Sequence, residues 1–150
     1  VQQILFRVPA RENRDIIPWA TYTDPELAHV GLSEEEAAKR HGGRISILRW
    51  PYAENDRAQT ERKTRGLIKL VVDRKARILG VSIAGAGAGE MINMWALAVT
   101  NAMTLKDVRG YVPPYPTMAE IGKRAAVSYY TPMTRKPYVR WIVRFLRRFG

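Results

Sequence analysis

The stretch from Leu67 to Ala84 reads LIKLVVDRKARILGVSIA and contains the two clearest strands of the chain, residues 67–73 and 78–84. Both runs are rich in β-branched and aliphatic residues, which are typical of strands. The polar connection between them, residues 73–77, is too short for a parallel crossover, which needs a dozen or more residues. The stretch therefore predicts an antiparallel hairpin, and with it an antiparallel sheet.

Further strands are predicted before this hairpin. Residues 17–23 have the aromatic and β-branched content of a strand, and a second short run covers 28–32. A third strand begins at Ile45, and Pro51 bends it. Residues 52–65 are polar and charged, and their pattern does not choose between an exposed strand and a loop.

Helices are predicted mainly after the hairpin. One short helix precedes it, because Ser33 opens a capping box, and this helix ends at the glycines 42–43. The others are an apolar helix over 91–103, a short helix that runs from Thr104 to about residue 110, and a helix over 117–130. Strands followed by helices predict an α+β fold, an antiparallel β-sheet covered by helices. The apolar helix should be buried in the core or in a subunit interface, because apolar residues surround nearly all of it.

The composition allows one domain with appendages. A chain of 150 residues with 46% hydrophobic content can bury one core and is too short for two comfortable domains. We assign residues 1–16 to a lead-in segment from upstream domains, 17–134 to the domain itself and 135–150 to a basic tail. Because the sequence begins at Val1 and its first residues resemble the middle of a chain, we interpret it as a fragment of a longer protein.

Several classes of site are not expected from the residue counts. The chain has no cysteine, which excludes a disulfide framework and a thiol nucleophile within it. His29 and His41 are its two histidines, so a zinc site is not expected. No apolar run reaches the length needed to span a bilayer, and no signal-peptide pattern is present. We therefore expect a cytoplasmic protein.

A glycine-rich segment, residues 85–89, lies between a predicted strand and a predicted helix. In a dinucleotide-binding fingerprint such a segment cradles a pyrophosphate on backbone amides. Here Glu90 stands where the third glycine of the fingerprint belongs, and the preceding strand belongs to a hairpin rather than to a βαβ unit. The favoured interpretation is structural: small residues allow the helix to pack closely on the sheet.

The tail carries much of the net charge of +11. Residues 135–150 contain six basic residues and no acidic one, which leaves 11 − 6 = +5 for the rest of the chain. At 100° per residue, the segment 138–149 places its aromatic and aliphatic residues on one arc and its arginines on the other. Two interpretations remain open: a terminal helix docked on the domain, or attachment to an anionic membrane surface. The residues expected at that surface are Arg140, Trp141, Arg144, Arg147 and Arg148.

Nucleic-acid binding is not expected of the tail, because its basic residues are not interleaved with outward-facing aromatics.

A proline-rich stretch, residues 113–120, precedes the last helix of the domain and reads PPYPTMAE. The prolines disfavour helix, so Tyr115 should be presented on an extended segment. Thr117 can cap the following helix, with Glu120 completing a capping box. Glu120 therefore has two open roles, a structural cap or a functional carboxylate.

Several of these stretches, in this order, resemble a known family. The run from Tyr22 to Glu34, YTDPELAHVGLSE, resembles the signature that opens the C-terminal dimerisation domain of the FAD-dependent pyridine nucleotide-disulfide oxidoreductases. This family includes dihydrolipoamide dehydrogenase, glutathione reductase and mercuric reductase. The resemblance continues from about Ile17 to Ala126 through residues 55–58, 66–70, 78–80 and 88–92.

The last hallmark of that family, His-Pro-Thr-x-x-Glu, falls on residues 115–120. In dihydrolipoamide dehydrogenase-like members the histidine, held by the glutamate, reaches into the partner's active site as an acid/base. Tyr115 takes the histidine position here, as it does in mercuric reductases, although the C-terminal cysteine pair of those enzymes is absent. A phenol is a poor base at neutral pH but can donate a hydrogen bond to a developing thiolate.

The resemblance implies a dimerisation domain that completes the active site of a partner subunit in a homodimer. It implies Tyr115 and Glu120 as catalytic residues, with Pro116 and Thr117 near the FAD region of the partner subunit. FAD, NAD(P) and redox cysteines are expected on other domains of the same chain, and the fragment alone is expected to be inactive and to bind no cofactor. The alternative is a stand-alone binding module that uses the tail at the inner face of a membrane.

Overall fold

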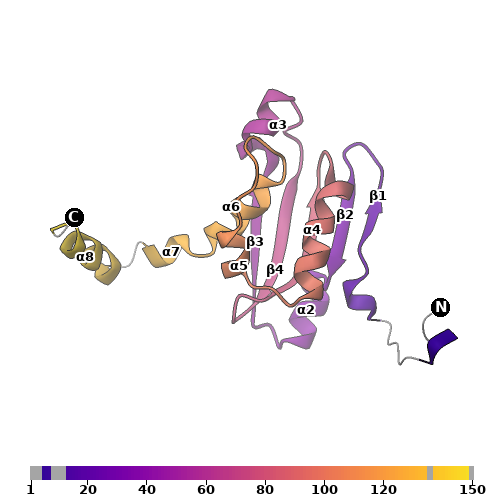
Figure 1. Ribbon diagram of the computed structural model, residues 1–150, viewed down its shortest axis with the longest axis horizontal. Helices are drawn as coiled ribbons and strands as arrows, with labels where there is room; N and C mark the ends of the chain where they lie inside the picture. The colour runs from indigo at the N-terminus through magenta and orange to yellow at the C-terminus, as the bar shows by residue number, and fades with distance from the viewer. Residues whose placement is uncertain (1–4, 8–12, 135–136, 149–150) are drawn as a thin grey trace.

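The computed structural model describes residues 5–7, 13–134 and 137–148, and its regular elements form one antiparallel sheet with helices (Figure 1). The strands of the sheet lie in the order β1-β2-β5-β4-β3, and every neighbouring pair is antiparallel. Their bounds are β1 Trp19–Thr21, β2 Leu27–Gly31, β3 Ile45–Pro51, β4 Leu67–Asp73 and β5 Ile78–Ala84. The predicted hairpin is confirmed as β4 and β5, and the α+β fold class with it.

The helices occupy the remaining segments between and after the strands. A short 3-10 helix, η1, precedes β1, and a second, η2, follows β3 directly. Their bounds are η1 Arg14–Ile16, α2 Glu34–Arg40, η2 Tyr52–Glu54, α3 Asp56–Thr60, α4 Ala88–Thr100, α5 Leu105–Gly110, α6 Glu120–Ser128, α7 Thr131–Thr134 and α8 Pro137–Leu146. In the described part of the chain, no helix has both the length and the apolar character needed to cross a bilayer.

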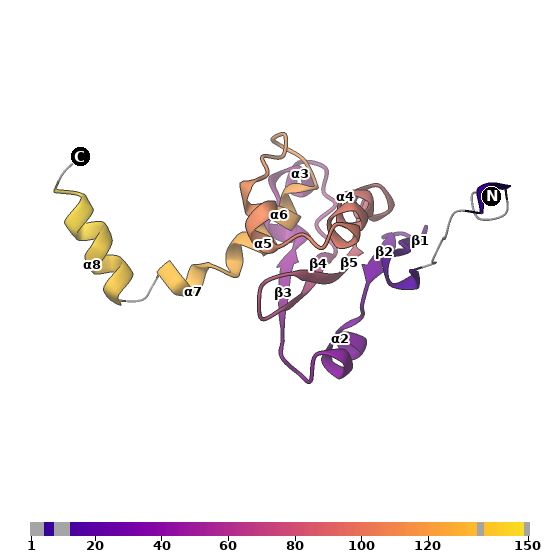
Figure 2. The same cartoon turned by 60° about the horizontal axis from the view of Figure 1, so that its bottom comes forward.

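The main core lies between the sheet and two helices that cover one of its faces (Figure 2). Helix α4 packs on β2 and β5, and α6 packs on β3 and β4. Where the two helices meet, Gly122 of α6 touches the indole of Trp95 of α4, and a Cβ on this glycine would lie 2.4 Å from the ring. A smaller cluster on the opposite face packs Ala37 of α2 against Val71 and Leu79.

Local capping signals were reliable guides to two helix starts. Ser33 caps α2, with its hydroxyl bound to the backbone N–H of Glu36 and the Glu36 carboxylate bound to the backbone N–H of Ser33. Thr104 and Asp107 form the same reciprocal pair at the start of α5. Both predicted helices are confirmed, because the capping residues and their partners lie within one turn.

The structure corrects the predicted start of the helix over 117–130. Helix α6 begins at Glu120, with Ala119 in the capping position and no side-chain cap. The hydroxyl of Thr117 instead donates to the carbonyl oxygen of Pro114, at 2.8 Å. The capping box of Thr117 and Glu120 is therefore wrong, because the hydroxyl is used within the preceding turn.

Residues 52–65 are not an exposed strand, and they are not a continuous loop either, because they contain the short helices η2 and α3. Asn55 determines where α3 begins. It is 1% exposed, and its side-chain oxygen accepts a hydrogen bond from the backbone N–H of Ala58, at 2.8 Å. An asparagine before a short helix is a preferred cap. Its burial under a second segment depends on residues far away in the sequence.

The predicted apolar helix is α4, which begins and ends about three residues earlier than expected. Its inner side is buried in the core through Ile92, Trp95 and Ala98. Leu97 lies on the outer side and is 62% exposed. The helix therefore serves the core and also presents an apolar side chain to the outside.

The tail forms α8, although part of it lies outside the described residues. Arg135, Lys136 and Phe149 are among the residues not described, and the side chain of Arg140 is not described either. Trp141, Arg144, Arg147 and Arg148 are exposed on the helix or directly after it.

Candidate functional site

The candidate site is the arm between α5 and α6, residues 111–119, which carries Tyr115. The Tyr115 side chain is 71% exposed, and the peptide bond to Pro116 is cis. Its hydroxyl donates a hydrogen bond to Oδ2 of Asp56 at the start of α3, at 2.9 Å. The expectation of an exposed tyrosine on a non-helical segment is confirmed, and its partner is a carboxylate 59 residues away in the sequence.

Asp56 favours the protonated form of the Tyr115 phenol. The hydrogen bond from Tyr115 to Asp56, together with the negative charge of Asp56, raises the pKa of Tyr115 above its ordinary value. Since that ordinary value is already about 10, the phenol is protonated at neutral pH. Tyr115 is therefore a hydrogen-bond donor rather than a base.

The base of the arm is held by a buried side chain. Nδ2 of Asn55 donates to the carbonyl oxygen of Thr117, at 3.0 Å, while the oxygen of the same amide caps α3. Both functions of the amide are thus satisfied, and one side chain ties the arm to the helix that carries Asp56. This arrangement fixes Tyr115 and Asp56 relative to each other.

Glu120 lies close to the arm but is paired elsewhere. One of its carboxylate oxygens accepts from Arg124, with the closest contact at 3.0 Å, and its side chain is 17% exposed. Within the described residues, the Tyr115 hydroxyl donates its hydrogen bond to Asp56 and not to Glu120. The structure therefore brings Tyr115, Pro116 and Thr117 together on the arm and places Glu120 at the first turn of α6.

The sequence pattern does not single out Asp56 as a site residue. The available signal is its position in the motif of residues 55–58, where Asn55 is a recognisable cap and Asp56 follows it directly. Neither residue reveals its partner on the arm, because the contacts with Thr117 and Tyr115 span 62 and 59 residues.

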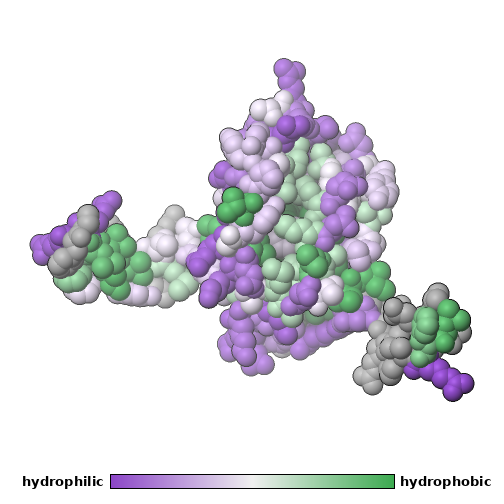
Figure 3. All heavy atoms as spheres, in the orientation of Figure 1, coloured by the Kyte–Doolittle hydropathy of each residue, from purple (hydrophilic) through white to green (hydrophobic). Residues whose placement is uncertain are grey.

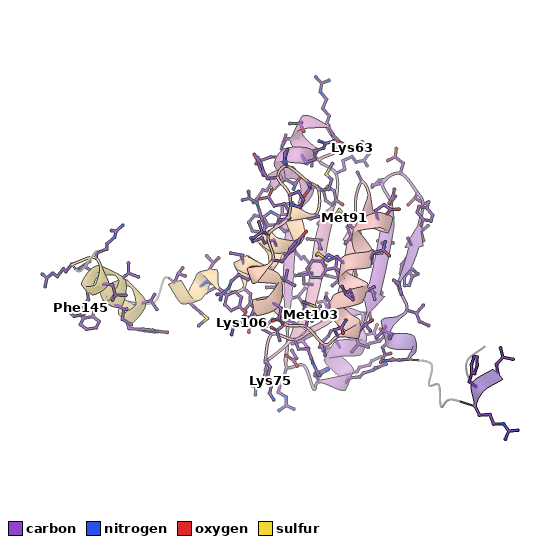
Figure 4. The ribbon with its side chains drawn as sticks, in the orientation of Figure 1. Lys63, Lys75, Met91, Met103, Lys106 and Phe145 are labelled. Atoms are coloured by element: carbon purple, nitrogen blue, oxygen red, sulfur yellow. The ribbon has the colours of Figure 1, made fainter. Side chains whose placement is uncertain are left out.

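A groove lies between α4 and the arm. It is lined by Glu90, Met91, Met94 and Trp95 of α4 and by Tyr111 and Ala119 of the arm. Exposed Leu97, on the same helix, and Val112, which is 79% exposed, extend the apolar surface. Hydrophobic residues reach the surface on the face that carries α4 (Figure 3), and Met91 lies on the part of α4 nearest the arm (Figure 4).

The glycine-rich segment has a structural role. Helix α4 begins after Gly87, and the backbone N–H of Gly89 donates to the Glu26 carboxylate, at 2.8 Å. The ring of Tyr52 lies against Gly85, and its hydroxyl donates to the carbonyl oxygen of Ala86, at 3.0 Å. An intramolecular carboxylate thus occupies the helix N-terminus where a pyrophosphate would bind. The segment is thus held by contacts within the chain, which favours the structural interpretation.

The chain is thus a helix-covered antiparallel sheet that carries a groove beside α4 and an anchored, exposed arm. The family model for the dimerisation domain of pyridine nucleotide-disulphide oxidoreductases matches residues 17–126. The chain belongs to this family, as the order of its motifs indicates.

Relatives of the chain carry the name dihydrolipoyl dehydrogenase. The mitochondrial enzyme of Rattus norvegicus is 38% identical over 120 residues, which cover 78% of this chain and 23% of the relative. That of Caenorhabditis elegans is 35% identical over 123 residues, covering 81% and 25%. The chain therefore spans about a quarter of the length of the curated relatives it matches.

Solved structures share the fold. LpdA from Mycobacterium tuberculosis superposes with a TM-score of 0.78 at 22% identity, over 85% of this chain and 28% of that one. The flavoprotein disulfide reductase RclA from Escherichia coli, as its Cu(II) complex, gives a TM-score of 0.72 at 29% identity, over 77% and 26%.

Proposed function

We propose that this chain forms the subunit interface of a homodimeric, FAD- and NAD(P)-dependent disulfide oxidoreductase of the dihydrolipoyl dehydrogenase type. Its arm then completes the active site of the partner subunit. The observation that carries the proposal is the anchored arm. Tyr115 is exposed, yet the arm that carries it is held at Thr117 by the buried side chain of Asn55. A residue that is both fixed and exposed is suited to act on a group brought by another chain.

The subunit contact is proposed to form on the face that carries α4. Leu97 and Val112 are exposed, and the groove beside them is lined by Met91, Met94 and Tyr111. Exposed apolar patches of this kind mark interaction sites more often than ordinary solvent surface. In a two-fold dimer the same patch would meet its own copy.

Within that dimer, Tyr115 is proposed to act as a neutral hydrogen-bond donor. When a thiolate develops on the redox-active sulfur of the neighbouring site, the Tyr115 O–H can donate to it and stabilise its charge. Asp56 is the positioning residue, because it holds the hydroxyl in place in the free subunit. FAD is proposed to bind other domains of the full-length protein, where it would supply electrons to the disulfide.

The test of Tyr115 uses the full-length enzyme and a dithiol substrate. A hydrogen bond to a charged group contributes roughly 1.5–3 kcal/mol, so Tyr115→Phe should lower kcat about ten- to a hundredfold. Tyr115→His should retain or raise turnover of the dithiol, since an imidazole can also accept the proton. Unchanged turnover in both variants removes Tyr115 from the mechanism.

The contribution across the interface is tested with mixed dimers. One subunit carries Tyr115→Phe with intact redox cysteines, and the other carries an intact Tyr115 with its redox cysteines replaced. If the arm acts on the partner, the site with intact cysteines receives an intact Tyr115 and the mixed dimer keeps about half of the normal activity. If that site shows the activity of the Tyr115→Phe enzyme, the arm acts within its own subunit.

The interface is tested by a charge on the outer side of α4. Leu97→Arg should shift the full-length enzyme from dimer to monomer in analytical ultracentrifugation, because a buried unpaired charge is costly at an interface. Leu67→Arg is the matched control, since Leu67 is also partly exposed, at 38%, but lies on β4. A dimer of unchanged strength in Leu97→Arg would contradict the assignment of this face.

A further inference from the structure

Helix α8 is separated from the body of the domain. In both cartoon views it projects beyond α7 on the side away from β1 (Figures 1 and 2). Its apolar side chains are exposed: Tyr138 by 54%, Trp141 by 66%, Val143 by 49% and Leu146 by 60%. Exposed apolar residues along one side of a helix indicate a surface that binds another apolar surface.

The apolar residues of α8 form one continuous surface. Trp141 and Phe145 are one helical turn apart and their rings stack, with centroids 5.9 Å apart and planes at 14°. Ile142 and Leu146 continue the surface along the same side of the helix, by the spacing of four residues. Figure 3 shows this hydrophobic side of α8 facing the viewer, beside hydrophilic residues at its edge.

The opposite side of the helix is basic and has no acidic neighbours in the sequence. The last acidic residue of the chain is Glu120, so no carboxylate follows α6. Arg144, Arg147 and Arg148 are exposed, and no salt bridge within the described ranges includes them. The charge of this side is therefore available to an external anion.

We propose that α8 lies in the surface of an anionic phospholipid membrane, with Trp141, Ile142 and Leu146 among the acyl chains and the arginines at the phosphates. Such a membrane surface complements both sides of α8 at once. A phospholipid surface offers an apolar layer and a layer of negative charge within the width of one helix. A nucleic acid would neutralise the arginines and leave the apolar side in water, whereas a second α8 would cover the apolar side and leave the arginines unpaired.

The dimensions of α8 agree with a position along the surface. A helix of ten residues is about 15 Å long, half of the hydrocarbon thickness of a bilayer. Trp141 and Tyr138 have the amphipathic rings that favour the boundary between acyl chains and headgroups. The point where the tail leaves the body is fixed by Arg109, whose guanidinium lies 4.7 Å from the centre of the Tyr130 ring.

The test measures binding of the full-length protein to vesicles by co-sedimentation. Vesicles of phosphatidylcholine alone are compared with vesicles that also contain phosphatidylglycerol. Each basic residue near an anionic surface strengthens binding roughly fivefold, so the variant Arg144→Glu with Arg147→Glu should bind the anionic vesicles at least about 25-fold more weakly. Leu146→Glu should also abolish most binding, because it places a charge among the acyl chains.

The matched control changes the net charge by the same amount away from α8. Lys75→Glu with Lys106→Glu alters two exposed lysines of the body, which Figure 4 shows well apart from the tail. This control should bind anionic vesicles nearly as well as the unchanged protein. Equal loss in the control and in the arginine variant would mean that net charge, not α8, causes binding, and would overturn the proposal.

Two further outcomes would also overturn it. Equal binding to neutral and anionic vesicles would contradict the role of the arginines. Loss of self-association in Leu146→Glu, without any vesicle binding by the unchanged protein, would identify a second copy of α8 as the partner. The membrane proposal does not depend on the proposed enzyme activity, since vesicle binding is measured without turnover.

Discussion

The arm and the tail both expose large aromatic side chains, but they hold them in different ways. Tyr115 is 71% exposed and Trp141 is 66% exposed. The arm is tied to the body by the buried amide of Asn55, and Tyr115 donates to a defined carboxylate. Trp141 has a neighbouring ring on its own helix instead. A similar exposure is therefore held by contacts with the rest of the domain in the arm and by contacts within one helix in the tail.

The largest expected effect tests the anchor of the arm. Asn55→Ala removes the cap of α3 and leaves the partly buried carbonyl of Thr117 without its donor. The two losses together should lower the free energy of unfolding by about 2–4 kcal/mol. Urea denaturation measures this change. Asn93→Ala is the control, since the exposed Asn93 bonds only carbonyls of its own helix, and a comparable loss there would contradict the special role of Asn55.

The next largest effect tests the packing of α6, the helix that follows the arm, against α4. Gly122→Ala places a Cβ against the indole of Trp95 and should lower the free energy of unfolding by about 1–3 kcal/mol. Gly110→Ala, at a position with open space around the added carbon, should be neutral or slightly stabilising. Thermal unfolding of the two variants measures the difference. Equal stability would show that α4 and α6 can separate without cost.

The hydrogen bond of Tyr115 gives a smaller effect that depends on pH. Because the folded pKa of Tyr115 is raised, the stabilisation is complete below the unfolded pKa of about 10 and is lost as the pH rises through the folded pKa. Asp56→Asn removes the charge and should return the pKa of Tyr115 toward its ordinary value. NMR titration of labelled tyrosine carbons reads this directly, and an unchanged titration would show that Asp56 does not bind the hydroxyl.

The smallest effect is expected from the tail. A protein that ends before Pro137 should unfold in water within about 0.5 kcal/mol of the full chain, since the side chains of α8 are largely exposed. Chemical denaturation in the absence of lipid tests this. A clear loss of stability would mean that α8 packs on the domain, which was the alternative left open by its sequence.

The sequence predicted those elements whose determinants are local. Residues 67–73 and 78–84 agree with β4 and β5, because β-branched runs and a short turn suffice to specify a hairpin. Ser33 caps its helix through a partner three residues away. The α+β class followed from the order of such elements.

The candidate site was predicted in part, because its remaining contacts are distant in sequence. Tyr115 was identified from its position between prolines, but its partner Asp56 was not. Thr117 was assigned to a cap that its neighbour Pro114 prevents by accepting the hydroxyl. Such competition between nearby acceptors depends on the path of the backbone, which the arm takes only when Asn55 holds it.

The Glu26 carboxylate at the start of α4 can also be regarded as a tethered competitor. Any free phosphate or nucleotide would have to displace an anion that belongs to the same chain and is never diluted. An attached ligand has an effective concentration far above that of dissolved metabolites when the geometry is fixed. The Glu26 carboxylate therefore competes directly with any dissolved anion that approaches the start of α4.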